Sequence, residues 1–363
     1  MRIQFDYVGD ISERQWRYFV ARCEPFATPE QNLDWMAFLE RRSDLIDRKH
    51  CPPIKVMSVW NAKDLEALFY VSVEDNLHVT SADARTYVNL SRELCANIIG
   101  FHVRLSLAHG LGLIYAIGDN GNRAVMEGIE ALEYHAWERG LNYVQISRVH
   151  ADSDLRSFLA KRGYLEFPNI SNYVLDVTWG SFDEYLGSVS GKTRRNIRRD
   201  RRIFESSALY LGLLNSEVNF DRLYHLHEAV CEKYGGKPYV RRDFFRTALS
   251  DLSGFGGVCA FYQKEPVGAI LCYRSNEVLS VKFAGMNYQW REANVYPNLM
   301  YGVIEQAIES GIRKIALGLA NEEQKKRLGA REELSYRYIL PFSTDLKVML
   351  SSTLALWKGA PMS

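Results

Sequence analysis

The stretch from residue 278 to residue 339 constrains the fold of this chain most strongly. It reads as a strand (278–284), a polar turn, an amphipathic helix that starts at Pro297, a strand (314–317), a short helix (322–328) and a strand (335–340). Proline suits the first helical turn, because its missing N–H would have no partner there. This order predicts parallel pairing of the first two strands, with a helix N-terminus beside their carboxyl ends, a place suited to an anionic donor.

A degenerate repeat of this order occurs earlier in the chain. A strand (111–117), a long helix, Gly140, a strand (143–147), a short helix and Gly163 match the later strand (278–284), long helix, Gly311, strand (314–317), short helix and Gly329. The match is one of element order and glycine placement. It suggests duplication of one α/β unit, with a boundary near residues 179–184 and mixed sheets in both halves.

Length and composition are consistent with two domains. The chain has 363 residues, of which 47% are hydrophobic, enough for two cores. Lys and Arg number 45 against 44 Asp and Glu, so any basic surface must be local. Six cysteines without metal-ligand spacing read as reduced thiols. The amino terminus lacks an apolar signal core and no apolar run approaches a membrane span, which predicts a cytoplasmic protein.

The segment from Lys192 to Arg202 is the one strongly basic part of the sequence. It holds seven cations in eleven residues, and helical spacing places most of them on one side. Arginine's planar fork suits phosphate oxygens. The alternative is a solvated helix whose charges pair with acidic neighbours. Ser190-Gly-Lys-Thr is not a phosphate-binding loop, because Leu186 stands where the upstream glycine of that motif would fall.

Several motifs in the second half carry a family resemblance. Lys-x-Arg-Arg-Asn-Ile-Arg-Arg (192–199), Glu-Lys-Tyr-Gly (232–235) and Ala-x-x-x-Lys-Glu-Pro-Val-Gly-Ala (260–269) are followed by the Pro297 helix and by Lys-Lys-Arg-Leu-Gly-Ala (325–330). Over about residues 180–345 this resembles the second domain of the Fem-type aminoacyltransferases and the related tandem GNAT-like acyltransferases. Residues 1–178 resemble the first domain of that family in element order and length.

The resemblance implies two GNAT-like domains, at 1–178 and 179–363, and an acyltransferase that moves an acyl or aminoacyl group to an amine. The donor would be an acyl-CoA or an aminoacyl-tRNA, with no permanently bound cofactor. Two features depart from the family. An Arg-Phe-Lys before the final glycine is replaced by Gln-Lys-Lys-Arg-Leu (324–328), and the usual GNAT donor loop is absent between Met286 and Pro297.

Candidate site residues follow from this resemblance and from the chemistry of acyl transfer, which needs a neutral nucleophile and an aligned carbonyl. Lys325 and Lys326 are assigned to the donor phosphate or ester oxygen. Tyr234 or Glu232 is a candidate base. The expected donor-binding side chains are cationic or polar: Lys192, Arg194, Arg195, Arg198, Lys282, Tyr296 and Asn298.

The sequence predicts neither a metal site nor a nucleophilic triad. His225 and His227 are two residues apart and point to different faces of a helix, so they are interpreted as one core or surface histidine each. The leading hypothesis is an N-acyl or N-aminoacyl transferase that acts on a small molecule or a peptide-like precursor. A non-catalytic module that binds RNA or a phosphorylated ligand through the arginine helix is the alternative, and a structural scaffold is a third. No DNA partner is expected.

Overall fold

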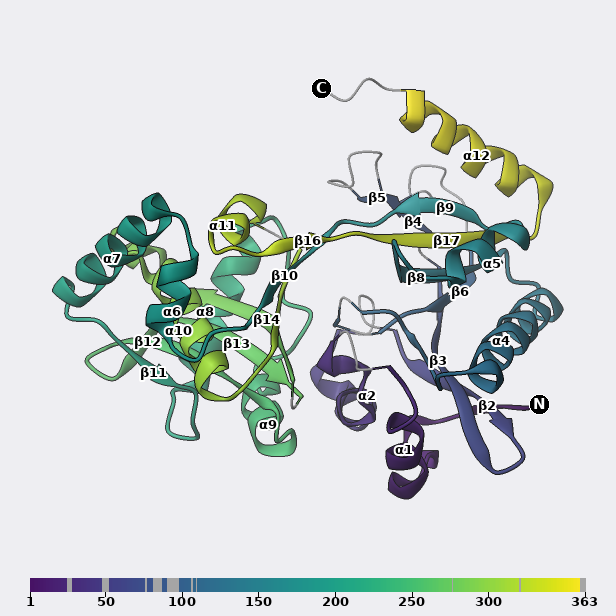
Figure 1. Cartoon of the computed structure of the whole chain (residues 1–363), viewed down its shortest axis with the longest axis horizontal. Helices are drawn as coiled ribbons and strands as arrows, with labels where there is room; N and C mark the ends of the chain where they lie inside the picture. The colour runs from purple at the N-terminus through teal and green to yellow at the C-terminus, as the bar shows by residue number, and fades with distance from the viewer. Residues whose placement is uncertain are drawn as a thin grey trace.

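The computed structural model of the protein describes residues 1–24, 28–47, 52–75, 77–80, 87–89, 98–105, 107–108, 110–275, 277–319 and 321–359. Two lobes lie side by side, each built on a mixed β-sheet, and extended strands cross between them (Figure 1). We call the lobe that holds the amino terminus the first unit and the other the second unit. None of the helices described combines the length and the hydropathy needed to cross a bilayer.

The sheet of the first unit has the order β1-β2-β3-β6-β8-β17-β9, with β7 also paired to β3. Its strands are β1 (Arg2–Asp6), β2 (Ile54–Asn61), β3 (Asp64–Glu74), β6 (Gly100–Val103), β7 (Leu113–Tyr115), β8 (Tyr143–His150), β17 (Ser335–Pro341) and β9 (Leu165–Pro168). Pairing is antiparallel except between β6 and β8, which are parallel. A separate hairpin joins β4 (His78–Thr80) to β5 (Tyr87–Asn89).

The sheet of the second unit has the order β11-β12-β13-β14-β15-β10-β16. Its strands are β11 (Tyr210–Leu213), β12 (Phe255–Tyr262), β13 (Glu265–Arg274), β14 (Val278–Met286), β15 (Lys314–Gly318), β10 (Asn172–Asp176) and β16 (Arg331–Glu333). Here β14 and β15 are the parallel pair, as the sequence predicts. The two sheets therefore share one plan, in which three antiparallel strands lead into a parallel pair.

The helices cover both faces of the sheets. In the first unit they are η1 (Val8–Asp10), α1 (Glu13–Val20), η2 (Pro29–Gln31), α2 (Leu33–Arg41), η3 (Ser43–Leu45), α4 (Asp119–Glu138) and α5 (Leu155–Lys161). In the second they are α6 (Phe182–Ser188), α7 (Gly191–Ser206), α8 (Phe220–Lys233), α9 (Phe244–Asp251), η4 (Tyr288–Ala293), α10 (Val295–Glu309) and α11 (Glu322–Arg327). Helix α12 (Thr344–Gly359) follows β17.

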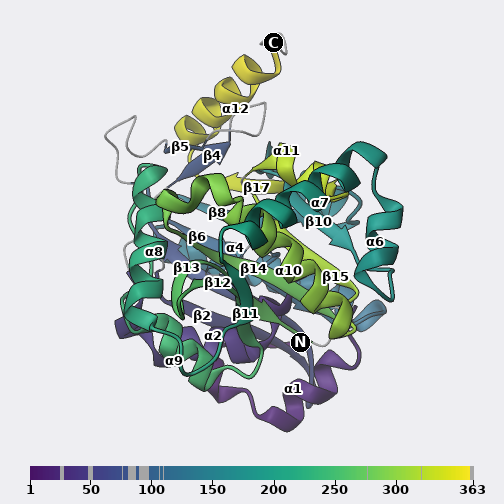
Figure 2. The ribbon, with the colours of Figure 1, turned by 90° about the vertical axis from the view of Figure 1, so that its left-hand side faces the viewer.

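Alternation along the strands separates the two faces of the second sheet. Val258 and Ile270 pack in one hydrophobic core with α7 and α10, whereas Cys259 and Leu271 pack in another with α8 and α9. The second of these cores continues into the first unit, where Phe38 of α2 meets Phe244 of α9 edge to face. Helices α8 and α9 thus lie between the sheets, and α7 and α10 lie on the outer face (Figure 2).

The predicted strand–helix–strand core of the second unit is confirmed with small shifts. Helix α10 begins two residues before Pro297, and Gly311 follows its end with a left-handed backbone at φ +66°. The predicted match between the first copy of the repeat, which starts at strand 111–117, and the second copy is partly wrong. The predicted strand 111–117 is β7, which covers only Leu113–Tyr115, and the strand that pairs in parallel is β6, in a region without a clear sequence pattern.

Sheet membership crosses the predicted boundary at 178/179 in both directions. Strand β10 precedes the boundary but pairs with β15 and β16 of the second unit. Strand β17 follows the whole second unit but lies between β8 and β9 of the first. The division into 1–178 and 179–363 stays a prediction for the helices and loops, and the two units exchange one strand each.

Candidate active-site cavity

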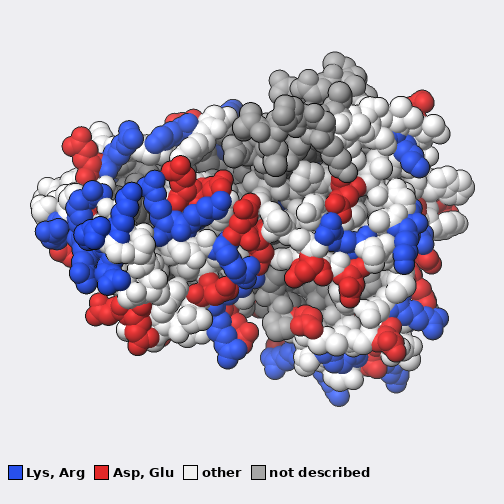
Figure 3. All heavy atoms as spheres, turned by 45° about the horizontal axis from the view of Figure 1, so that its top comes forward, with Lys and Arg blue, Asp and Glu red and all other residues white. Residues whose placement is uncertain are grey.

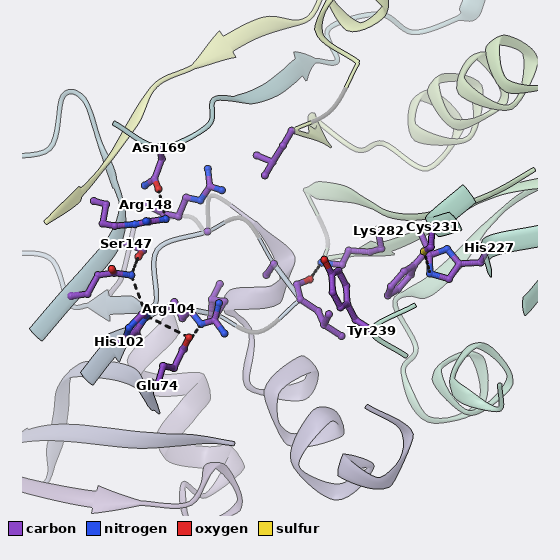
Figure 4. A pocket seen from close by; sticks show the side chains of 18 residues that line it. Glu74, His102, Arg104, Ser147, Arg148, Asn169, His227, Cys231, Tyr239 and Lys282 are labelled. Atoms are coloured by element: carbon purple, nitrogen blue, oxygen red, sulfur yellow. Dashed lines mark hydrogen bonds and ion pairs between the residues drawn. The ribbon is translucent and has the colours of Figure 1, made fainter. Parts of the chain in front are cut away.

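A cavity of about 560 Å³ lies between the two units, and residues from both line it (Figure 4). Its volume is within the range usual for small-molecule sites. The first unit contributes a polar wall: Glu74, His102, Arg104, Gln145, Ser147, Arg148, Asn169 and Arg337. The second unit contributes a less polar wall: His227, Cys231, Tyr239, Lys282, Phe283 and Leu319.

In the second unit the cavity lies where the parallel strands separate. Strands β14 and β15 pair only from Val278 to Ser280, although β14 continues to Met286 beside β13. A register shift between Leu271 and Cys272 of β13 leaves Lys282 as the extra residue of β14. Such a bulge re-aims the side chain, so Lys282 and its neighbour Phe283 both reach the cavity. None of the strands that the structure describes pairs with this edge of β14 beyond Ser280.

The first unit opens at the equivalent place. Strands β6 and β8 pair in parallel only up to Val103 and Ile146. The chain then leaves the sheet after Arg104 and returns at Gly112, whose carbonyl accepts a hydrogen bond from Tyr70 N at 2.8 Å. Strand β7 resumes the pairing with β3. The second unit thus has a single-residue bulge at Lys282, where the first unit has a longer excursion after Arg104. Residues from both places line the same cavity.

A second bulge shapes the polar wall. Tyr336 of β17 pairs with Val149 of β8 and Tyr338 pairs with Ile146, so Arg337 alone stands opposite Ser147 and Arg148. Arg148 adopts a left-handed backbone at φ +67°, which is uncommon for a residue with a Cβ. All three bulge residues line the cavity.

Hydrogen bonds and ion pairs fix the side chains of this wall. Glu74 lies 2.7 Å from Arg104 Nε and 3.6 Å from His102 Nδ1. The other imidazole nitrogen of His102 is 2.6 Å from the Tyr143 hydroxyl. Arg148 Nη1 donates to the carbonyl of Ile170 at 2.7 Å, and Arg337 Nη2 donates to Asn169 Oδ1 at 3.3 Å. The charged side chains of this wall are therefore held by protein partners.

The facing wall holds a histidine and a cysteine one helical turn apart on α8. His227 Nδ1 lies 2.9 Å from the carbonyl oxygen of Ala284, so this nitrogen carries the proton and donates it. His227 Nε2 lies 3.6 Å from Cys231 Sγ. Burial lowers the pKa of His227, and the bond to Ala284 offsets part of that effect. Burial, with Glu228 and Glu232 nearby, raises the pKa of the Cys231 thiol. The pair is thus a neutral imidazole beside a protonated thiol.

Lys282 is in the cavity wall, as a donor-binding residue should be, but it also has protein partners. Its Nζ lies 2.8 Å from Glu30 Oε1 of η2 and donates a hydrogen bond to the carbonyl of Leu107. Both side chains of this ion pair are almost fully buried, and Trp35 lies beside the ammonium. Lys282 therefore joins the two units at the edge of the cavity.

The predicted arginine helix is confirmed as α7, yet it does not reach the cavity. Lys192, Arg195 and Arg198 are exposed and Arg194 is half-buried. Figure 3 shows basic side chains gathered at this end of the second unit. No residue of α7 is among those that line the cavity, because α7 packs on the outer face of the sheet through Ile197 and Phe204. Their assignment to the donor stays a prediction, with a location outside the cavity.

Two other predicted donor-binding residues lie around α10. Asn298 is buried, and its amide donates to the carbonyl of Asp200 at 3.1 Å and to that of Asn294 at 2.9 Å. It fastens α10 to α7, and its assignment to the donor stays a prediction. Tyr296 is half-buried; burial raises the pKa of its hydroxyl, and a hydrogen bond with Asn321 opposes that effect.

The two lysines assigned to catalysis differ in their surroundings. Lys325 is 4% exposed, and burial lowers its pKa to about 7. Its Nζ lies 5.6 Å from the ring centre of Tyr173 in β10. Lys326 is half-exposed and pairs with Glu322 at 2.5 Å. Neither lines the cavity.

Tyr234, the predicted base, is 78% exposed, and Glu232 is exposed as well. Neither belongs to the cavity wall. His227 and Cys231, which do, were missed by the sequence reasoning, although their spacing of four residues on one helix was visible. Arg148 and Arg337 carried no such signal, because a bulge between strands distant in sequence brings them together. The described part of the chain contains no cluster of three or more His, Cys, Asp or Glu side chains that could hold a metal ion.

Comparison with known proteins agrees with this architecture. Residues 191–326 match the acetyltransferase (GNAT) domain family. No curated protein matches the chain. Among solved structures, FemX has a TM-score of 0.63 at 10% identity and covers 96% of this chain and 99% of its own.

Two further solved structures share the fold. The C-terminal domain of a putative lysylphosphatidylglycerol synthetase from Agrobacterium fabrum has a TM-score of 0.55 at 10% identity, with 88% and 96% covered. L-PGS from Bacillus licheniformis has a TM-score of 0.50 at 13% identity, with 77% and 89% covered. At these identities the likeness concerns the fold. Residues 191–326 thus match the GNAT domain family, and the chain as a whole shares the fold of FemX, with two GNAT-like units.

Proposed function

We propose that this protein is an N-acyl or N-aminoacyl transferase and that the transfer takes place in the cavity between its units. One observation carries the proposal. A neutral histidine, His227, lines the cavity beside the edge of β14 that has lost its parallel partner. A GNAT-type domain supports acyl transfer in general, and the cavity provides a place for it.

The chemistry needs few groups. The acceptor amine attacks the carbonyl carbon of the donor, a C–N bond forms, and the C–S or C–O bond to the leaving group breaks. His227 Nε2 takes the proton that the amine loses and returns it to the departing thiolate or ribose oxygen. The bond from Nδ1 to Ala284 holds the ring in the tautomer this requires. Backbone amides on the open edge of β14 would orient the carbonyl.

The donor is either an acyl-CoA or an aminoacyl-tRNA. In both, phosphates lie at a distance from the acyl group, and the exposed cations Lys192, Arg195 and Arg198 of α7 are suited to bind them. Because α7 lies on the outer face of the second sheet, the donor would have to extend from that face to the cavity. Lys325 would act between these places, at the ester oxygen or a phosphate. A steep fall in affinity with salt would identify tRNA, since many counterions are then released.

The test is transfer itself. Purified protein is incubated with acyl-CoAs or charged tRNAs and a mixture of amines, and products are followed by mass spectrometry. We expect one amine to gain the mass of the acyl group, and His227→Gln to abolish most of this gain while it still binds the donor. Transfer that continues unchanged in His227→Gln would remove the histidine from the mechanism.

The position of α7 outside the cavity favours one second candidate, a module that binds RNA or a phosphorylated ligand without catalysis. Tight, salt-sensitive binding with no mass gain for any donor would support this reading and would overturn the transferase.

A further inference from the structure

We propose that the polar wall of the cavity is an oxyanion-binding site, where Arg104, Arg148 and Arg337 bind a carboxylate or phosphate group of a small ligand. The three guanidinium groups come from segments that are far apart in sequence, namely the end of β6, the end of β8 and the centre of β17. All three line one cavity, and Figure 4 shows Arg104 and Arg148 on the same side of it. Arginine binds either oxyanion with two parallel hydrogen bonds.

Irregular pairing builds this wall. The bulge that sets Ser147 and Arg148 opposite Arg337 interrupts the β8/β17 ladder just where β6 leaves β8. Arg104 is the last paired residue before the excursion that starts there. A regular ladder would alternate side chains between the two faces of the sheet. The bulge instead re-aims neighbouring side chains, and Ser147, Arg148 and Arg337 all reach the cavity.

Within this bulge, the backbone of Arg148 has an uncommon conformation. At φ +67° a residue with a Cβ is strained, whereas glycine adopts this conformation at no steric cost. Strained residues of this kind concentrate at functional sites. The side chain of Arg148 is held by the carbonyl of Ile170 at 2.7 Å and still lines the cavity.

The surroundings fix the guanidinium groups and set the charge of the wall. Asn169 accepts a hydrogen bond from Arg337, and Glu74 pairs with Arg104. Among the described residues of the polar wall, three arginines stand with one carboxylate, that of Glu74. Most of these side chains are buried, which strengthens their attraction for an anion. The wall therefore favours a negatively charged group.

The ligand class follows from the two walls together. The oxyanion site and His227 line the same cavity, so a single molecule can place an anionic group at one and an amine at the other. If the proposed transferase function holds, the acceptor is therefore a small amine that also carries a carboxylate or a phosphate. The oxyanion site itself requires no catalysis and can be tested without it.

The experiment measures binding by calorimetry, with inorganic phosphate and glutarate as probes, on the full chain. The variants are Arg148→Gly, which suits the left-handed backbone, and Arg337→Gln. Arg17→Gln, on the exposed helix α1, is the matched control. We expect at least one probe to bind wild type and the control, and its affinity to fall at least about tenfold in both cavity variants. The thermal midpoint of Arg148→Gly should not fall.

The outcomes separate the possibilities. Binding of phosphate alone points to a phosphorylated ligand, and binding of glutarate alone points to a carboxylate. If neither probe binds, or if both cavity variants bind as wild type does, the site is overturned, and in the latter case the anion binds elsewhere. Arg337→Lys keeps the positive charge and should retain part of the affinity. This variant distinguishes an affinity lost with the charge from an affinity lost because Arg337→Gln has unfolded. Because no turnover is measured, a failed transferase assay leaves this result intact.

Discussion

His227 Nδ1 lies 2.9 Å from the carbonyl oxygen of Ala284. Ala284 belongs to β14, at a point beyond the end of its parallel pairing with β15. A carbonyl only accepts hydrogen bonds, so the contact assigns the proton to Nδ1 and leaves the lone pair of Nε2 on the side of Cys231. The imidazole is thus oriented by the same strand that would orient the acyl carbonyl.

Replacement of this histidine should reduce transfer and spare the fold. In His227→Gln we expect kcat/KM to fall by about 10² to 10⁴, the usual contribution of a positioned base. Cys231→Ser keeps a hydroxyl near Nε2 and should retain most of the activity. Steady-state kinetics of the two variants, with circular dichroism as a check on folding, decides the point. Equal losses in both would show that the pair has only a packing role.

The pH dependence should follow the lowered pKa of His227. Its ordinary pKa is 6.5 and burial lowers it, so the neutral form predominates at pH 7 and kcat/KM should decline only at a pH below 6.5. Between 6.5 and the folded-state pKa the unfolded chain binds more protons, so folding stability should also fall as the pH is lowered. His227→Gln should lose this acid limb in both measurements. An acid limb above pH 7 in the wild type would contradict the assignment.

The buried ion pair between Lys282 and Glu30 should hold the units together. Glu30→Gln leaves the buried ammonium without its carboxylate, and we expect a loss of about 3–5 kcal/mol in the free energy of unfolding. The double variant Glu30→Gln/Lys282→Met should be more stable than the sum of its single changes predicts. Urea denaturation gives all four values. The exposed pair Arg17–Glu13 is the control, with an expected effect below about 1 kcal/mol.

Lys325 should destabilise the protein at neutral pH. Its pKa is about 7 in the folded chain against 10.5 ordinarily, which corresponds to at most about 5 kcal/mol. Lys325→Met should therefore raise the thermal midpoint most below pH 7, and the gain should shrink as the pH rises from 7 to 10.5. Lys326→Met, at the neighbouring half-exposed position, should change little. A gain that is the same at pH 7 and pH 10 would show that Lys325 is not desolvated.

The exposed arginines of α7 should contribute to donor binding and not to stability. We expect Arg198→Ala to weaken donor binding about fivefold and to reduce the salt slope by about one, with an unchanged thermal midpoint. Arg201 is the contrast on the same helix, because it pairs with Glu305 at 2.6 Å and lies over the ring of Phe182. Arg201→Ala should lower the midpoint. Filter binding and thermal denaturation, run side by side, separate the two roles.

Local patterns predicted much of the second unit. Apolar periodicity and the positions of Pro297 and Gly311 located α10, and the order of elements gave the parallel pairing of β14 with β15. Such features depend on residues close together in sequence. The pairing of β17 with β8 does not, because its register joins Tyr338 to Ile146 across almost two hundred positions. No periodicity in either segment specifies the other.

The candidate site was harder to predict for the same reason. Lys282 was predicted from its place on a strand, but its partner Glu30 lies in η2 of the other unit. The arginines of α7 were conspicuous as a charge run, yet the helix packs on the outer face of the sheet. In the sequence, Arg148 directly follows the predicted strand 143–147, and nothing in the pattern distinguishes it from other polar residues. Its role depends on a bulge, and a bulge is a property of two paired strands together.

The exchange of β10 and β17 makes the two halves of the molecule mutually dependent. Each sheet has an interior position that only the other half of the chain can fill. Neither half can unfold without removing a strand from the sheet of the other half. Thermal and denaturant unfolding should therefore each show a single cooperative transition. A chain cut near residue 178 would yield two incomplete pieces, each lacking its interior strand until the other supplied it.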